Sequence, residues 1–288
     1  MKSYSHDDLL AFRFDGLPNG DGPVHHAVFS RRGGVSVAPF DSLNLSMAVA
    51  DERERVYANR RRAYGLFGRD TDTVVHAHLV HGATVARVTT AENGTWVHHV
   101  DGLITDQPGC VLTMSFADCA PILLYDPVHR AIGLGHAGWK GAVADLPGAL
   151  VRAMQAQFGS DPAALLAAVG PCIGPCCYEV GEIVIDAVRA AFAAPDELLR
   201  PMMSDELRVT SDEFKAIGDQ STPLATRHSP PTTHRHFDLP EANRRNLLNA
   251  GVRHVELAEH CTACRTDLFF SHRAEKGRTG RFGVVLGL

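Results

Sequence analysis

Short apolar segments recur along the chain, and their spacing predicts its secondary structure. Where apolar residues alternate with polar ones, or run on for about four to eight residues between turn-forming residues, the pattern indicates β-strands. The predicted strands are residues 74–80, 84–88, 111–116, 122–125, 131–135, 165–169, 254–258 and 282–286.

Apolar residues at helical spacing predict helices between some of these strands. Asp51 is the predicted N-cap of the first helix, Gly159 ends the second, and Gly251 follows the last. The predicted helices are residues 51–67, 146–158, 181–192 and 240–249.

The order of these elements favours an α+β fold over strict alternation of strand and helix. The strands within residues 74–88 and 111–135 follow one another without a helix, so we expect antiparallel hairpins or meanders there. We expect a single domain over residues 1–288, with mixed β-sheets flanked by helices. Residues 195–236 are polar and contain several prolines, which predicts a long loop or insertion.

The composition argues against several classes of function. A formal net charge of -5 at pH 7 is unlike a nucleic-acid-binding protein, which needs a basic surface. No stretch approaches the roughly 18 apolar residues that span a bilayer, and the polar residues 1–8 are unlike a signal peptide. We therefore expect a cytoplasmic protein without a membrane partner. In that reducing setting we expect the seven cysteines to form no structural disulfide.

Three segments each place one metal-binding side chain at the end of an apolar run, beside a residue that breaks regular structure. Their metal-binding residues are His81, Cys119 and His136. Two imidazoles and one thiolate are a ligand set for zinc with an open fourth position, as in catalytic zinc sites. The same cysteine and histidine also fit a nucleophile and its base, so both interpretations stay open.

A predicted hairpin brings Cys119 and His136 together. They are 17 positions apart, which suits two strands joined by a short turn at residues 126–127. Pro121 has no amide hydrogen and interrupts the strand just after the thiol, so the thiol can face a cavity. Asp118, beside the cysteine, is expected to orient a ligand or act as an acid or base, with a buried structural carboxylate as the alternative.

The remaining cysteines and histidines give weaker signals. The cysteine-bearing segment 170–178 is rich in glycine and proline, which favours a buried tight turn over a metal site. Cys261 and Cys264 have ligand spacing, but a closed zinc site needs four ligands and the sequence does not name the other two. We therefore assign them to the core or a pocket wall. The His-x-His pairs at residues 76–78 and 234–236 lack the further motifs of a copper oxidase.

Together these segments resemble the YfiH family, also called the multicopper polyphenol oxidase (laccase) domain family and the peptidoglycan editing factor family. The resemblance covers nearly the whole chain. The motifs that carry it are Arg32-Gly33-Gly34-Val35-Ser36, Ser42-Leu43-Asn44-Leu45, Val80-His81-Gly82, Asp101-Gly102-Leu103-Ile104-Thr105, Ala117-Asp118-Cys119-Ala120-Pro121, His136-Ala137-Gly138-Trp139, Gly170-Pro171-Cys172-Ile173-Gly174, Cys177-Tyr178-Glu179-Val180-Gly181, Phe237-Asp238-Leu239 and Cys261-Thr262.

The resemblance implies an α+β fold and a zinc site formed by His81, Cys119 and His136, with copper as the other metal to consider. It implies phosphorolysis of purine nucleosides (adenosine, inosine and S-methyl-5'-thioadenosine) together with adenosine deaminase activity. The partners are then a purine nucleoside and phosphate, and both a monomer and a homodimer stay open. This sequence departs from the family pattern at several positions, which bear on substrate preference. They are Leu79 for a usual Gln, Phe116 for Thr, Lys140 for Arg and Pro240 for Trp.

Arg31, Arg32 and Asn44 are the predicted contacts to phosphate or ribose, because two guanidinium groups followed by glycines form an anion-binding pattern. A solvated turn is the alternative for the two arginines. Three other functions compete with the zinc enzyme. They are a metal-free hydrolase or amidase that uses Cys119 with His136 to edit peptidoglycan precursors, a non-catalytic zinc-stabilised interaction protein and, last, a copper polyphenol oxidase.

Overall fold

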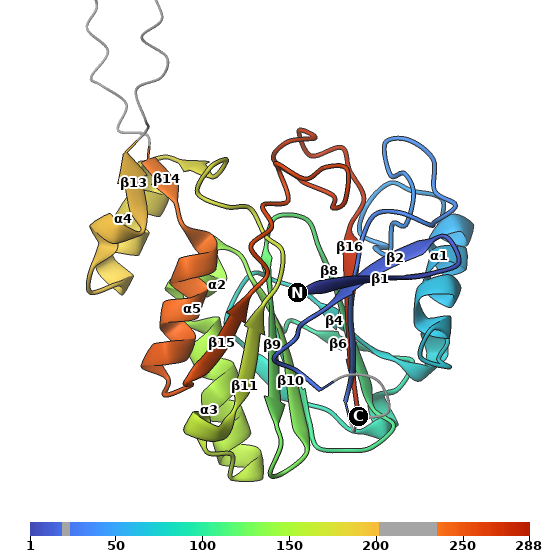
Figure 1. Cartoon of the computed structure of the whole chain (residues 1–288), viewed down its shortest axis with the longest axis horizontal. Helices are drawn as coiled ribbons and strands as arrows, with labels where there is room; N and C mark the ends of the chain where they lie inside the picture. The colour runs from blue at the N-terminus through green and yellow to red at the C-terminus, as the bar shows by residue number, and fades with distance from the viewer. Residues whose placement is uncertain (19–23, 202–234) are drawn as a thin grey trace, which may run out of the picture.

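The computed structural model describes residues 1–18, 24–201 and 235–288. In these residues two large β-sheets pack face to face (Figure 1). The seven-stranded sheet consists, in spatial order, of β1 (Lys2–His6), β2 (Leu9–Arg13), β3 (His25–Phe29), β16 (Phe282–Gly287), β8 (Val111–Phe116), β4 (Val75–His78) and β6 (Trp96–His98). The six-stranded sheet consists of β15 (His254–Leu257), β11 (Leu166–Val169), β9 (Ala120–Asp126), β10 (Ala131–Ala137), β7 (Gly102–Thr105) and β5 (Val85–Arg87).

Strand β9 shows why the six-stranded sheet is buried on both faces. Leu123 and Tyr125 belong to the core cluster between the two sheets, whereas Ile122 and Leu124 belong to the cluster beneath the helices. Successive side chains of a strand point to opposite faces, so a continuous apolar run is what a strand covered on both sides requires.

Helices cover the outer face of each sheet, which gives the layer order helix, sheet, sheet, helix (Figure 1). The helices α3 (Leu146–Phe158) and α5 (Leu239–Asn249) pack on the six-stranded sheet, next to the short α2 (Trp139–Val143). On the opposite side α1 (Arg53–Gly65) packs on the seven-stranded sheet through buried residues near its C-terminal end.

Helix α3 illustrates how local sequence fixes an element. The Asp145 side chain accepts a hydrogen bond from Gly148 N at 3.1 Å, and Pro147 lies in the first turn, where its missing N–H does no harm. Gly159 ends the helix in the left-handed conformation with a φ of 74°, as its position in the sequence predicted.

The predicted α+β fold with mixed sheets is confirmed, but two of the predicted connections are wrong. Strands β9 and β10 form the predicted antiparallel hairpin. Strands β8 and β9 belong to different sheets, as do β4 and β5. The chain therefore passes from one sheet to the other between them and does not form a hairpin. The apolar run of each strand is suited to either sheet, and the sequence does not say which sheet the next strand joins.

The predicted N-cap of the first helix is also wrong. Helix α1 begins after Glu52, which makes no side-chain capping bond. The Asp51 carboxylate instead accepts hydrogen bonds from Ser36 Oγ at 2.6 Å and Asn44 Nδ2 at 2.9 Å. Partners brought in by the tertiary fold therefore outcompete the local cap.

A third, small sheet corrects the predicted loop at residues 195–236. Its strands are β12 (Glu179–Val180), β14 (Arg235–Phe237) and β13 (Leu199–Pro201), beside the helix α4 (Glu182–Ala191). The predicted loop therefore begins with a 3-10 turn (Pro195–Glu197) and strand β13 and ends in strand β14, and residues 202–234 lie outside the described residues. In the described part of the chain, no helix is long and apolar enough to cross a membrane.

Candidate metal centre

The side chains of His81, Cys119 and His136 converge on one point. One ring nitrogen of each histidine and the Cys119 Sγ all lie within 4.8 Å of one another. The two imidazole rings meet edge to face, with centroids 4.9 Å apart. All three residues were singled out from the sequence, and the structure brings them together.

The β9–β10 hairpin places two of these side chains. Its register pairs Pro121 with His136 and Ala120 with Ala137, so Cys119, just before β9, lies beside the end of β10. Cys119 also follows the crossing from β8 in the other sheet. The thiol therefore lies where the chain passes between the two sheets.

A buried carboxylate that the sequence analysis did not select holds the two histidines. Asp101 accepts hydrogen bonds from the backbone N–H groups of His81 at 2.9 Å and Gly82 at 2.7 Å. His81 itself has a φ of 61°, and these bonds hold the turn in that conformation. Asp101 acts on the backbone around His81, a role that leaves no periodic signal in a sequence.

The same carboxylate orients the ring of His136. Nδ1 of His136 lies 3.1 Å from Oδ1 of Asp101, and the backbone N–H of His136 donates to the Asp101 carbonyl at 2.8 Å. Metal-binding histidines commonly use one nitrogen in this way, which fixes the tautomer and leaves the other nitrogen for the metal. Burial raises the pKa of Asp101, but the hydrogen bonds from His136 and Gly82 outweigh it, so the pKa is lowered.

The thiol and its neighbouring imidazole stabilise each other's charge. Burial would raise the pKa of Cys119, but the charge and hydrogen bond of His136, with a hydrogen bond from His81, lower it to about 6. Burial would lower the pKa of His136, but Cys119 and Asp101 raise it to about 9. In the metal-free protein Cys119 is therefore largely a thiolate near neutral pH, the form that binds metal.

One glycine makes room for the centre, and one of its histidines is open to solvent. A Cβ at Gly138 would lie 2.8 Å from Cys119 Sγ and 3.8 Å from Cδ2 of His81. His136 is buried whereas His81 is exposed, so the centre can be reached from one side.

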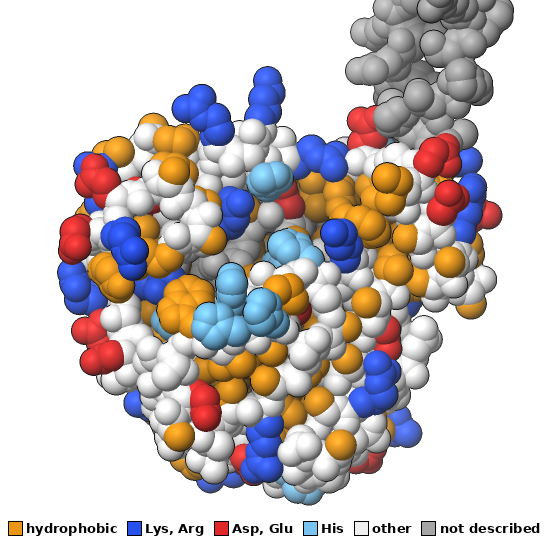
Figure 2. Space-filling model, turned by 180° about the vertical axis from the view of Figure 1, so that it is seen from behind, with side chains coloured by type: hydrophobic (Ala, Val, Ile, Leu, Met, Phe, Trp, Pro, Cys, Tyr) orange, Lys and Arg blue, Asp and Glu red, His pale blue; other side chains and the backbone are white. Residues whose placement is uncertain are grey.

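A second group of histidines lies on the surface. The exposed His78, His98 and His99 have ring centroids within 6.2 Å of one another. Figure 2 shows histidine side chains gathered near the middle of one face.

Asp118 is next to Cys119, but its carboxylate is bound by another loop. Thr262 Oγ1 and Ser271 Oγ donate to its Oδ1 at 2.6 and 2.8 Å, and the backbone N–H of Arg273 donates to its Oδ2 at 2.7 Å. Its φ of 82° is in the left-handed region. These contacts support a positioning role beside the thiol.

The predicted phosphate and ribose contacts have other partners. Arg31 Nη1 donates to the Thr266 carbonyl and to Glu275, and the Arg32 guanidinium donates to Asp267. The Asn44 side chain, which is buried, donates to the Ser46 carbonyl and Asp51 and accepts from two backbone N–H groups. An amide has four hydrogen-bonding positions, so this pattern disfavours the predicted ribose contact.

Arg281 is a second residue that the sequence analysis missed. Burial lowers the pKa of this guanidinium, while the charges of Asp118 and Cys119 act in the opposite direction, so Arg281 lies within electrostatic range of the centre. The backbone N–H of Arg281 donates to Asn44 Oδ1 at 2.9 Å. The Nη1 of Arg281 donates to the carbonyls of Thr279 and Gly280. In the sequence, Arg281 is indistinguishable from a surface arginine at the start of a strand.

Comparisons with known proteins agree over almost the full length. A family model described as multi-copper polyphenol oxidoreductase laccase matches residues 25–288. Purine nucleoside phosphorylase YlmD of Geobacillus stearothermophilus is 37% identical over 267 residues, which cover 90% of this chain and 88% of the relative. Purine nucleoside phosphorylase YlmD of Bacillus subtilis is 32% identical over 268 residues, which cover 90% and 86%. The crystal structure of the hypothetical protein YfiH from Bacillus licheniformis is similar with a TM-score of 0.82 and 30% identity, and covers 98% of this chain and 97% of that one.

Proposed function

This chain belongs to the family of the multi-copper polyphenol oxidoreductase laccase model, with the YfiH and YlmD proteins, and on this basis we propose that it is a zinc-dependent purine nucleoside phosphorylase. The proposed substrates are phosphate with adenosine, inosine or S-methyl-5'-thioadenosine, and adenosine deamination is the proposed second activity. The observation that carries the proposal is the convergence of His81, Cys119 and His136 within 4.8 Å.

The residues of this centre fit a zinc ion. Two imidazoles and a thiolate match the donors of catalytic zinc sites, and the exposed side leaves a fourth position. Asp101 sets the tautomer of His136, and the missing side chain of Gly138 leaves room for the Cys119 sulfur. When bound, zinc supplies a Lewis acid that stabilises negative charge developing on the substrate.

The remaining residues bind and orient. We propose that the half-buried Arg281 holds phosphate, since it interacts electrostatically with Asp118 and Cys119 and a guanidinium matches phosphate geometry. In this proposal Asn44 supports phosphate binding indirectly, because its Oδ1 accepts the backbone N–H of Arg281 and so holds that residue in place. Arg31 and Arg32 stay predicted phosphate contacts that would have to exchange their present carboxylate partners. Asp118 stays a predicted catalytic residue, and its three hydrogen bonds favour positioning of Cys119 over proton transfer.

The direct test combines metal content with product analysis. Protein stripped by a chelator and reloaded with zinc should convert adenosine and phosphate to adenine and ribose 1-phosphate, whereas stripped protein should not. Inosine among the products would report deamination. His81→Ala should abolish turnover, and His78→Ala, an exposed histidine three positions earlier, should not. Full activity of the stripped protein would refute the zinc requirement, and the absence of ribose 1-phosphate with loaded protein would refute phosphorolysis.

The contact between Cys119 and His136 also supports a second candidate, a metal-free cysteine hydrolase or amidase. Such an enzyme would form an acyl-enzyme at Cys119 and would keep its activity after chelation. Chelation therefore separates the two functions. A thioester at Cys119 that carries the acyl group of a peptidoglycan-precursor amide, formed with release of the amine and detected by mass spectrometry in stripped protein, would favour the hydrolase.

A further inference from the structure

Four other cysteines, which the sequence analysis placed in a tight turn and a pocket wall, come together in the structure. Cys176 and Cys177 precede β12, and Cys261 and Cys264 follow β15. Their sulfur atoms all lie within 4.8 Å of one another. Cys264 Sγ is 3.4 Å from Cys176 Sγ and 3.3 Å from Cys177 Sγ.

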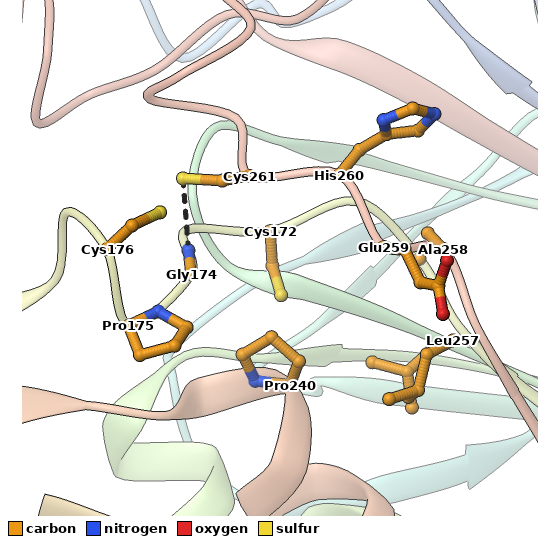
Figure 3. Close-up of a pocket in the computed structure, with 12 residues that line it drawn as sticks. Cys172, Gly174, Pro175, Cys176, Pro240, Leu257, Ala258, Glu259, His260 and Cys261 are labelled. Atoms are coloured by element: carbon orange, nitrogen blue, oxygen red, sulfur yellow. Dashed lines mark hydrogen bonds between the residues drawn. The ribbon is translucent and has the colours of Figure 1, made fainter. Parts of the chain in front are cut away.

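The turn at Gly174 arranges these thiols. Figure 3 shows the sulfur atoms of Cys176 and Cys261 pointing toward each other near Gly174, while Cys172 points away toward Pro240. The Gly174 N–H donates to Cys261 Sγ at 3.2 Å, and a Cβ at Gly174 would lie 3.3 Å from the Cys261 Cβ and 3.5 Å from Cys176 Sγ. The turn thus separates four converging thiols from a fifth that is buried elsewhere.

We propose that Cys176, Cys177, Cys261 and Cys264 hold a second zinc ion in a closed, tetrahedral site. Four thiolates are a ligand set of structural zinc sites, with Zn–S distances of about 2.3 Å. Tetrahedral geometry at that distance separates the sulfurs by about 3.8 Å. The two shortest contacts, at 3.3 and 3.4 Å, need to lengthen by only about half an ångström, and both are far above the disulfide length of about 2.05 Å.

The exposure of these thiols supports ligation. Cys176 and Cys264 are exposed, so a zinc ion can reach the cluster from solvent. Exposed thiols left free are also open to oxidation, and coordination removes that reactivity. All four positions of the ion are filled by the protein, so this site has no place for substrate and differs in kind from the open centre at Cys119.

The second zinc would hold together the two loops that contact Asp118. Cys172 and Cys261 form a β-bridge, and the N–H of Thr262 donates to the Cys172 carbonyl at 3.0 Å. Thr262 Oγ1 donates to Asp118 Oδ1 at 2.6 Å, and the N–H of Ile173 donates to the Asp118 carbonyl at 3.0 Å. Both cysteine loops therefore contact the residue that precedes Cys119. The proposed ion stabilises this side of the reaction centre without touching substrate.

Metal stoichiometry in single variants tests the proposal. The full chain, reduced, loaded with excess zinc and desalted, should hold two equivalents of zinc. Cys264→Ser and Cys176→Ser should each lower the content to one, and Cys119→Ala should lower it to one by emptying the other site. Cys110→Ser, a buried cysteine in neither cluster, should leave two. Unchanged zinc content in both Cys264→Ser and Cys176→Ser would overturn the proposal.

X-ray absorption at the zinc edge does not depend on how the serine variants fold. In Cys119→Ala protein the remaining zinc should show four sulfur neighbours near 2.3 Å and no nitrogen shell. A mixed nitrogen and sulfur shell, iron in place of zinc, or a stoichiometric disulfide among the four cysteines would overturn the proposal. If Cys119→Ala leaves the zinc content unchanged while Cys264→Ser lowers it, the proposed function fails and the second site stands.

Discussion

The two cysteine-bearing clusters of this molecule are built in opposite ways. His81, Cys119 and His136 lie at strand ends, and the buried Asp101 holds both histidines. Cys176, Cys177, Cys261 and Cys264 lie in loops near the surface, where backbone turns arrange them. The first set mixes nitrogen and sulfur and leaves one side open, whereas the second is all sulfur. The contrast separates a centre suited to reaction from one suited to holding loops together.

The largest expected difference between the clusters is in turnover. Cys119→Ala should lower adenosine phosphorolysis by roughly a thousandfold, because a catalytic metal contributes several kcal/mol to the transition state. Cys264→Ser should change turnover by less than about tenfold, since it acts only through the loops around Asp118. Steady-state kinetics with quantified zinc content measures both effects. Equal losses of turnover in the two variants would contradict the distinction between a catalytic centre and a structural one.

The role of Asp101 can be isolated with a matched carboxylate. Asp101→Asn should weaken zinc binding at the open centre by about 10–100-fold, because it removes the negative charge that faces His136 and replaces one of the two accepting oxygens with an NH2 donor. Asp126, the last residue of β9, also accepts two backbone N–H groups and contacts a histidine, His129. Asp126→Asn should lower only the free energy of unfolding. Competition with a chromophoric chelator measures the affinities, and similar zinc affinity in both variants would contradict the role of Asp101.

A smaller effect is expected from filling the space at Gly138. Gly138→Ala should weaken zinc binding by roughly tenfold, because the new Cβ would displace a sulfur now 2.8 Å from its position. Gly65→Ala, in helix α1 where a Cβ would meet nothing within 4 Å, is the control and should leave zinc binding unchanged. Titration of both stripped proteins with zinc compares them. An unchanged affinity in Gly138→Ala would show that the sulfur moves freely.

The two clusters should also differ in thiol titration after metal removal. The pKa of Cys119 is lowered to about 6, so its thiolate persists at neutral pH and is lost as the pH falls through about 6. Burial and the hydrogen bond with Cys264 raise the pKa of Cys176 to about 12. Iodoacetamide should therefore label Cys119 faster at pH 7 although Cys176 is more exposed, with the Cys119 rate falling about tenfold per unit below pH 6. Peptide mapping measures both labelling rates. Faster labelling of Cys176 would contradict the prediction that Cys119 is the thiolate at neutral pH.

The sequence predicted the centre at His81, Cys119 and His136 because these three residues follow or end recognisable apolar segments. The alternation in residues 122–125 and 131–135 predicts the hairpin, and the hairpin brings Cys119 to His136. Strands without such a pattern were missed. Strand β1 is mostly exposed and polar, and it is a strand because β2 pairs with it.

The loop-borne cluster could not be predicted in the same way. Cys176 and Cys264 are separated by 88 positions, and no periodic element connects them. Their approach depends on the bridge between Cys172 and Cys261, a tertiary contact. The sequence analysis missed Arg281 and Asp101 as site residues for a related reason. What distinguishes each of them is an interaction with groups that are distant in the sequence.

The strand order of the seven-stranded sheet has a consequence for synthesis on the ribosome. Strand β16 lies between β3 and β8 and is the only described strand that joins β1–β3 to the rest of that sheet (Figure 1). It follows every other strand in the chain, so a nascent polypeptide cannot close the sheet until residue 287 has emerged. Arg281 emerges with the same segment. A growing chain should therefore expose the face between the sheets to chaperones, and it should gain catalytic competence only in the final step of translation of this region.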